Sequence, residues 1–206
     1  MPKTINLTAL KTRSISSINH ATARYDTAKE NGQSYSLVRW IAKMTAVEIH
    51  AAWERYVEER LVTALNHDAK YFIQENELVG IKRVSSGFAS YVVRGGGKYF
   101  DFRSMRDLVG KTDKLLGKPD NPFRGLSNAD RNYIDALSAI RNCVVHRSSS
   151  SEASYKNEIR SVYNIKSAPQ PDEFLDALDK RPTSHARNKP RLIGLSLVVI
   201  QAIKNT

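Results

Sequence analysis

Apolar residues recur at helical spacing along most of the chain, and this pattern predicts a mainly α-helical protein. In residues 34–65 they return every three or four positions, which places them on one face of a long helix. The polar face of that helix carries Glu54 and Glu58, which we interpret as a solvated surface rather than a carboxylate pair for acid/base chemistry. The same spacing predicts further helices at residues 104–116, 127–146, 152–164, 171–179 and 190–204.

Three segments depart from this pattern. Residues 1–33 mix Ser, Thr and Asn with scattered aliphatic residues, so they predict an N-terminal arm before a domain at residues 34–206. Residues 86–103 place β-branched and aromatic residues on both sides of an Arg-Gly-Gly-Gly turn and predict a small β-hairpin insertion. A phosphate-cradling loop is less favoured there, because no Gly-Lys-Ser/Thr follows. The four serines at 148–151 predict a flexible loop.

The charge of the chain favours a polyanionic partner. Its 32 Lys and Arg residues exceed its 21 Asp and Glu residues, and the basic residues are scattered over the whole length. The single cysteine, Cys143, allows no internal disulfide, which fits a reducing cytoplasm. The first ten residues lack the apolar core of a signal peptide, and the most apolar stretch, 192–203, is too short and interrupted to span a bilayer. We therefore expect a cytoplasmic protein that binds nucleic acid and not membrane.

The helix at residues 127–146 carries the candidate chemistry. It begins at Ser127, which is followed three positions later by Asp130 in an arrangement similar to a capping box. Its last turns contain Arg141, Asn142 and His146. A permanent cation and the side chain that exchanges protons near neutral pH thus stand close together in a basic chain. This combination indicates phosphodiester chemistry on RNA.

Spacing alone does not identify this pair. An arginine followed by a histidine occurs twice more, as Arg13 with His20 and as Arg60 with His67. Arg13 lies in the expected arm, and Arg60 is followed by leucine within a continuous helix. Only Arg141 is followed by a polar residue near the end of a capped helix, so we take it as the candidate.

Residues 139–146, Ala-Ile-Arg-Asn-Cys-Val-Val-His, resemble the signature of the HEPN superfamily. The ribonucleases of that family carry Arg, a polar residue, a short filler and His late in a helix. The order of elements is also similar, because a long helix with an acidic and aromatic stretch at 48–54, Glu-Ile-His-Ala-Ala-Trp-Glu, precedes the motif helix. The resemblance covers residues 34–165 and implies an up-and-down helical bundle in which the hairpin is an insertion.

The resemblance implies an endoribonuclease that needs neither metal nor cofactor. In such an enzyme the ribose 2′-hydroxyl attacks the adjacent phosphate and leaves a 2′,3′-cyclic phosphate. His146 is then expected to transfer the proton, Arg141 to hold two phosphate oxygens, and Asn142 to bind the phosphate or orient the histidine. A toxin or anti-phage effector with an antitoxin or regulatory partner fits this activity. Ser148 stands where one toxin branch carries a tyrosine that its antitoxin modifies, so that mode of control is not expected.

Helical geometry constrains this site. Five positions along an α-helix rotate a side chain by roughly 140° beyond a full turn, so Arg141 and His146 do not share one narrow stripe. A helix that ends near Val145, or two chains paired about a two-fold axis, would bring the two side chains together. HEPN nucleases similarly form composite sites in a homodimer, and we expect a homodimer here, with two copies of His146 dividing the base and acid roles.

Other interpretations remain open. Arg141 can pair with a carboxylate while His146 caps the helix end. Cys143 with His146 can suggest a thiol nucleophile or metal ligands, although a lone cysteine among valines is more often buried. The chain can also be a non-catalytic HEPN-like module that binds RNA, a nucleotide or a partner protein, or an interaction subunit with no affinity for RNA. The products of incubation with RNA distinguish these classes.

Overall fold

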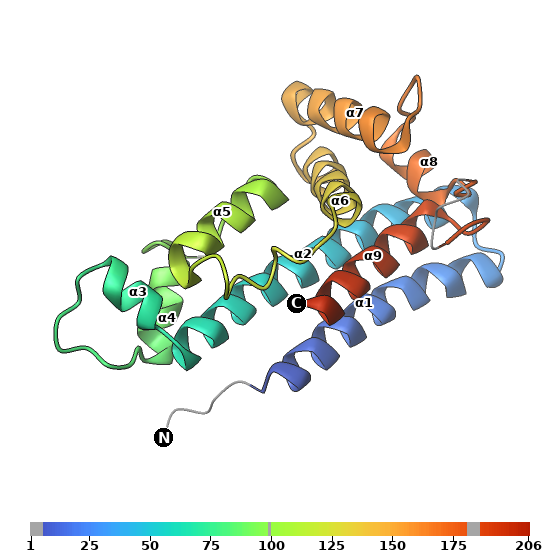
Figure 1. Ribbon diagram of the computed structural model, residues 1–206. Coiled ribbons are helices and arrows are strands. Elements are labelled where there is room, and N and C mark those ends of the chain that lie inside the picture. The colour runs from blue at the N-terminus through green and yellow to red at the C-terminus, as the bar shows by residue number, and fades with distance from the viewer. Residues whose placement is uncertain (1–5, 99, 181–185) are drawn as a thin grey trace.

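The computed structural model describes residues 6–98, 100–180 and 186–206, and within them the chain forms nine helices and no strand (Figure 1). The helices are α1 (Leu7–Glu30), α2 (Tyr35–His67), α3 (Lys70–Glu75), α4 (Ser86–Val93), α5 (Met105–Leu116), α6 (Asn128–His146), α7 (Ser149–Tyr163), α8 (Pro171–Asp176) and α9 (Arg191–Asn205). The prediction of a mainly α-helical protein is confirmed, as are the long central helix and the helices at 104–116 and 127–146.

Helix α2 is the centre of the fold. It contacts α1, α4, α5, α6, α8 and α9, and Figure 1 shows α1 and α9 running along it while α6 crosses it. The fully buried Trp53 of α2 stacks on Tyr56 with ring centroids 6.0 Å apart and meets Phe123 edge-on at 6.0 Å. Because Phe123 belongs to the loop that precedes α6, burial of these large rings anchors that loop on α2.

The segment expected to be an N-terminal arm is helix α1, and that expectation is wrong. Asn6 caps the helix by accepting a hydrogen bond from the Thr8 backbone N–H at 2.9 Å. The buried positions follow steps of three and four and are Leu10, Ser14, Ile18, Ala21, Tyr25 and Ala28. Several of them are small, so the apolar stripe is weak in the sequence although the period is helical. Because α1 packs on α2 and α9, it belongs to the bundle; residues 1–5 lie outside the described residues.

The expected β-hairpin at residues 86–103 is also wrong, because its first half is helix α4. Ser85 caps this helix by accepting a hydrogen bond from the Phe88 N–H at 3.2 Å. Ala89 and Val93, four positions apart, are buried, and α4 packs on α2. Tertiary packing thus overrides the strand preference of the β-branched residues. The glycine turn after the helix is confirmed, whereas Tyr99 in the expected second strand lies outside the described residues.

The serines expected to form a loop instead begin helix α7. Ser148 accepts a hydrogen bond from the Ser151 N–H at 3.2 Å, and the Ser151 hydroxyl accepts one from the Ser148 N–H at 3.1 Å. This reciprocal pair is a capping box built from two serines. Helices α6 and α7 are therefore joined by only Arg147 and Ser148. As a result, α7 begins directly after the last turn of the motif helix.

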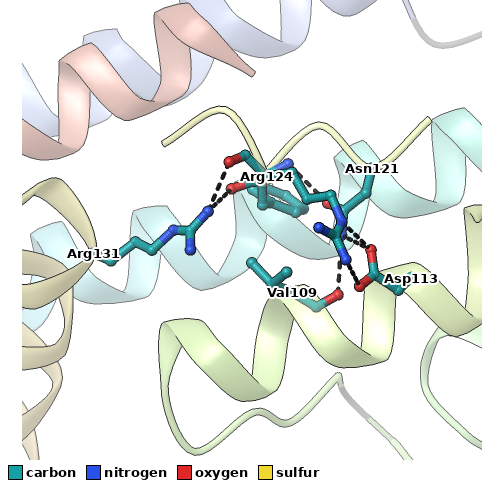
Figure 2. A network of polar contacts seen from close by, with 6 residues as sticks. Val109, Asp113, Asn121, Arg124 and Arg131 are labelled. Atoms are coloured by element: carbon teal, nitrogen blue, oxygen red, sulfur yellow. Dashed lines mark hydrogen bonds and ion pairs between the residues drawn. The ribbon is translucent and has the colours of Figure 1, made fainter. Parts of the chain in front are cut away.

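A polar network fixes the loop between α5 and α6 (Figure 2). Arg124 binds Asp113 through Nε–Oδ1 and Nη2–Oδ2 contacts of 2.8 and 2.6 Å. The Asn121 amide donates to Asp113 Oδ1 at 2.8 Å, and its oxygen accepts from the Phe123 N–H at 2.9 Å. Arg131 of α6 donates to the Arg124 carbonyl at 2.7 Å. The start of the motif helix is thus tied to the end of α5.

Asp113→Asn is expected to destabilise the protein in a pH-dependent way. The hydrogen bond from Arg124 lowers the pKa of Asp113, and this outweighs burial, which raises it; Asn121 lowers it further. A depressed folded-state pKa contributes stability above the unfolded pKa of about 3.9, and that contribution is lost as the pH falls through the folded pKa. We expect a loss of about 1–3 kcal/mol in the free energy of unfolding at pH 7.

Urea unfolding at pH 7 and at acidic pH tests this prediction. The difference from the wild type should shrink as the pH falls below about 4, while the exposed Asp120→Asn control should stay within about 0.5 kcal/mol of the wild type. An equal loss at both pH values would show that the ionised carboxylate of Asp113 is not what holds the loop.

Candidate active site

The motif helix is built as the sequence predicts. Ser127 accepts a hydrogen bond from the Asp130 N–H at 3.1 Å, and its own hydroxyl donates to Asp130 Oδ2 at 2.7 Å. Ile134, Leu137 and Ile140 are fully buried on the inner face. Helix α6 packs on α2 and α9 along this face, so its last turns are held at a defined place on the bundle surface.

The three predicted site residues meet within one chain. Arg141 Nη1 lies 3.2 Å from His146 Nε2 and donates to Asn142 Oδ1 at 2.9 Å. The contact forms although both residues are helical, because the long arginine side chain spans the angular offset between them. A second chain is therefore not needed to bring Arg141 to His146. This corrects the argument that the angular offset between them requires either a second chain or an earlier end of the helix. Asn142 contacts the guanidinium and thereby orients Arg141 rather than His146.

A hydrogen bond between these two side chains requires one tautomer of the imidazole. A guanidinium only donates hydrogen bonds, so Nε2 of His146 is the acceptor and Nδ1 carries the proton in this geometry. His146 is exposed and Arg141 is half-buried. A basic nitrogen lone pair thus stands beside a permanent cation at a place that solvent reaches.

Arg141 and His146 line a cavity of about 750 Å³. Its other walls come from α2 and from the segment after α4, and they are formed by Glu54, Arg55, Glu58, Glu59, Arg94, Phe100 and Asp101. The cavity lies where three elements far apart in the sequence come together.

Two of the three arginines that line the cavity form no direct ion pair within the described residues. Glu58 pairs with Arg94 and Glu59 with Arg13, whereas Glu54 contacts His50, which carries a charge only when it is protonated. Within the described residues, neither Arg55 nor Arg141 has a carboxylate within 4.0 Å. The carboxylates of Glu54 and Asp101 offset these two charges, so the cavity offers guanidinium geometry to an anion rather than an excess of positive charge. Two guanidinium groups are thus available to a bound anion.

A small polar network, with the buried His50 at its centre, adjoins the cavity through Glu54. His50 of α2, which is 5% exposed, places Nε2 2.8 Å from the Ser138 hydroxyl of α6 and Nδ1 3.3 Å from Glu54 Oε2. Burial raises the pKa of the Glu54 carboxyl. The contact with His50 and the charge of Arg141 together lower this pKa by more than burial raises it, so it lies below its usual value. Glu54 is therefore ionised near neutral pH and attracts Arg141.

Sequence reasoning missed the contribution of the long helix to this site. Glu54 and Glu58 were expected on a solvated face, yet both line the cavity, and the Glu58 side chain is only 18% exposed. Arg55 also lines the cavity, and no local pattern in the sequence marks it. The available signal was the placement of His50 and Glu54 four residues apart, which puts them on one side of a helix.

The thiol alternative has little structural support. Cys143 is buried, and burial raises the pKa of its thiol, so the reactive thiolate is disfavoured. Among the residues that the structure describes, no group of three His, Cys, Asp or Glu side chains is placed to hold a metal ion. Within the same residues Arg141 has no carboxylate in direct contact, so the pairing of Arg141 with a carboxylate is not observed.

The fold and the site together define a mainly α-helical protein with a paired arginine and histidine at a cavity lined by charged side chains. No protein-family model matches the chain, and comparisons with curated proteins and with solved structures also find no match. In the described part of the chain, every helix is too short or too polar to cross a membrane.

Proposed function

We propose that this chain is a metal-independent endoribonuclease of the HEPN type, with a HEPN-like helical bundle, that cuts single-stranded RNA. The observation that carries the proposal is the 3.2 Å contact between Arg141 Nη1 and His146 Nε2 at the cavity. A guanidinium fork matches two phosphate oxygens, and an imidazole transfers protons near neutral pH. The uncommitted Arg55 adds a second positive charge for the RNA backbone.

In the proposed reaction, the RNA phosphate and His146 compete for the guanidinium of Arg141. A phosphodiester that enters the cavity attracts the guanidinium, which frees the Nε2 lone pair of His146 to take the 2′-hydroxyl proton. The 2′-oxygen then bonds to phosphorus, the bond from phosphorus to the 5′-oxygen breaks, and a general acid protonates that oxygen. Arg141 stabilises the charge that accumulates on the phosphate oxygens, and Asn142 holds Arg141 in place.

A second copy of the chain is the proposed source of the general acid. Trp40 of α2 lies beside the end of α6, where it lines a cavity with Val144 and Arg147, and Trp40 and Val145 are exposed apolar side chains, by 55% and 48%. Clusters of exposed apolar residues typically mark protein interfaces. A homodimer built on this surface brings the partner subunit's His146 towards the same phosphate, and the two histidines then divide the base and acid roles.

An RNA-cutting activity of this kind requires control, so the proposal includes a toxin or anti-phage role with an antitoxin or regulatory protein. The position two residues after His146 is Ser148, whose hydroxyl caps α7. Control by modification of a tyrosine at that position is therefore not part of the proposal.

Incubation of the purified protein with end-labelled single-stranded RNA in EDTA tests the function. We expect fragments that end in 2′,3′-cyclic phosphate, and the same RNA with a single 2′-deoxy substitution at a cleavage site should resist cutting there. A cut that persists at the 2′-deoxy position would contradict the mechanism. The alternative of a non-catalytic binding module is supported by the engagement of Nε2 with Arg141, and it predicts salt-sensitive binding of RNA that stays intact.

A further inference from the structure

A second cavity adjoins the one that holds Arg141 and His146. Its volume is about 370 Å³, and it lies between the end of α4, the glycine turn that follows and α5. The two cavities share the wall residues Arg94, Phe100 and Asp101. A linear polymer bound at the first cavity can therefore extend into the second cavity.

The second cavity combines an apolar wall with positive charge. Val92, Val93 and Leu115 form the apolar side with Phe100, and Lys111 and Lys114 supply the charge. This combination suits a ligand that has a flat apolar group attached to an anion. A nucleotide is such a ligand, because it has a base and a phosphate. The volume is near the lower end of the range of about 300–1,000 Å³ found for small-ligand sites, so it suits one nucleotide.

The two lysines differ in how far they are already engaged. Lys111 Nζ donates to the Asp101 carbonyl at 2.6 Å and lies 3.1 Å from Asp107 Oδ2. Lys114 is exposed and, within the described residues, has no carboxylate within 4.0 Å. Lys114 is thus the cation that is free to bind a phosphate.

One carboxylate holds the wall between the two cavities. Glu58 of α2 accepts a hydrogen bond from Arg94 Nε at 2.7 Å and another from the Phe100 N–H at 3.3 Å, so it binds both ends of the glycine turn. Within the turn, Gly95 and Gly96 have φ of +59° and +77°, which favours glycine. Because Glu58 fixes the position of this shared wall, the fold also fixes the position of the second cavity relative to the first.

We propose that the cavity at Lys111 and Lys114 is a subsite for a nucleotide beyond the two that flank the scissile phosphate. This assignment rests on the proposed cleavage at Arg141 and His146. It predicts that the chain acts better on RNA that is long enough to fill both cavities than on a dinucleotide.

Cleavage of a pentanucleotide and of a dinucleotide, compared for the wild type and Lys114→Gln, tests the subsite. The wild type should favour the pentanucleotide, and Lys114→Gln should lower kcat/KM for it by about tenfold while leaving the dinucleotide unaffected, as expected for one lost charge-assisted contact. Lys166→Gln removes the same charge from an exposed position outside both cavities and should match the wild type. Equal loss in both lysine variants, or no loss in either, would overturn the subsite.

Binding of a labelled all-2′-deoxy pentanucleotide separates this inference from the proposed function. Lys114→Gln should raise the Kd about tenfold and reduce the slope of log Kd against log salt by about 0.7, the value for one phosphate contact on a single strand. If no RNA is cut but this change is seen, the proposed nuclease activity is wrong and the cavity stands as a nucleotide-binding site. If RNA is cut and Lys114→Gln binds and cleaves the pentanucleotide like the wild type, the nuclease stands and the subsite is wrong.

Discussion

Replacement of His146 by alanine is expected to slow RNA cleavage by about 10²- to 10⁴-fold, the range typical of a lost general acid or base. The imidazole is the group next to Arg141 that can take a proton near neutral pH. Since His146 is exposed at the end of α6, its loss should leave helical content and the melting temperature nearly unchanged. Single-turnover cleavage of a defined RNA, with circular dichroism on the same samples, measures both quantities.

His20→Ala is the matched control, because His20 is an exposed histidine of α1 that also follows an arginine in the sequence. It should cleave at the wild-type rate. Full activity in His146→Ala would refute the site assignment. Titration of the wild type with His146→Ala also tests the dimer, because an equal mixture should keep about one quarter of the activity if both histidines are required and about half if each chain acts alone.

Arg141→Lys is expected to lower the cleavage rate by about 10²- to 10³-fold despite the retained charge. Arg141 Nη1 contacts both Asn142 and His146, and the planar fork can bind two phosphate oxygens at once. Lysine offers a point charge on a flexible stem and does not reproduce that geometry. The loss should fall mainly on kcat, since the interaction strengthens as charge accumulates in the transition state.

Arg55→Lys is the matched comparison for Arg141, because Arg55 lines the same cavity but does not contact His146. We expect it to raise KM modestly and to leave kcat close to that of the wild type, as for a residue that only attracts the RNA backbone. Equal effects of the two substitutions on kcat would show that the fork of Arg141 has no special role.

Local sequence signals predicted the helices that have strong apolar stripes or clear caps. The long central helix and the motif helix starting at Ser127 belong to this group, because their periods and caps are properties of neighbouring residues. Helix α1 was missed because small residues such as Ala21 and Ala28 form part of its buried stripe. Helix α4 was missed because its β-branched residues prefer strands, and only the burial of Ala89 and Val93 against α2 decides for a helix.

The candidate residues themselves were accessible from the sequence, and their surroundings were not. The order Arg-Asn-Cys-Val-Val-His and the cap beneath it identify Arg141, Asn142 and His146 without any tertiary information. The angular offset between positions 141 and 146 suggested that a second chain brings them together, because a helical wheel ignores how far an arginine side chain reaches. The contact at 3.2 Å shows that the reach of this side chain is sufficient.

By itself, the sequence determined which chemical groups the protein carries, where its clear helices begin and which arginine stands near a histidine. The tertiary structure alone decided that Glu58 and Glu59 are paired with Arg94 and Arg13, so that Arg55 and Arg141 remain available to a ligand. The physical reason is that ion pairing depends on the distance between groups in space. For residues more than 30 positions apart, that distance is set by the packing of helices and not by local sequence.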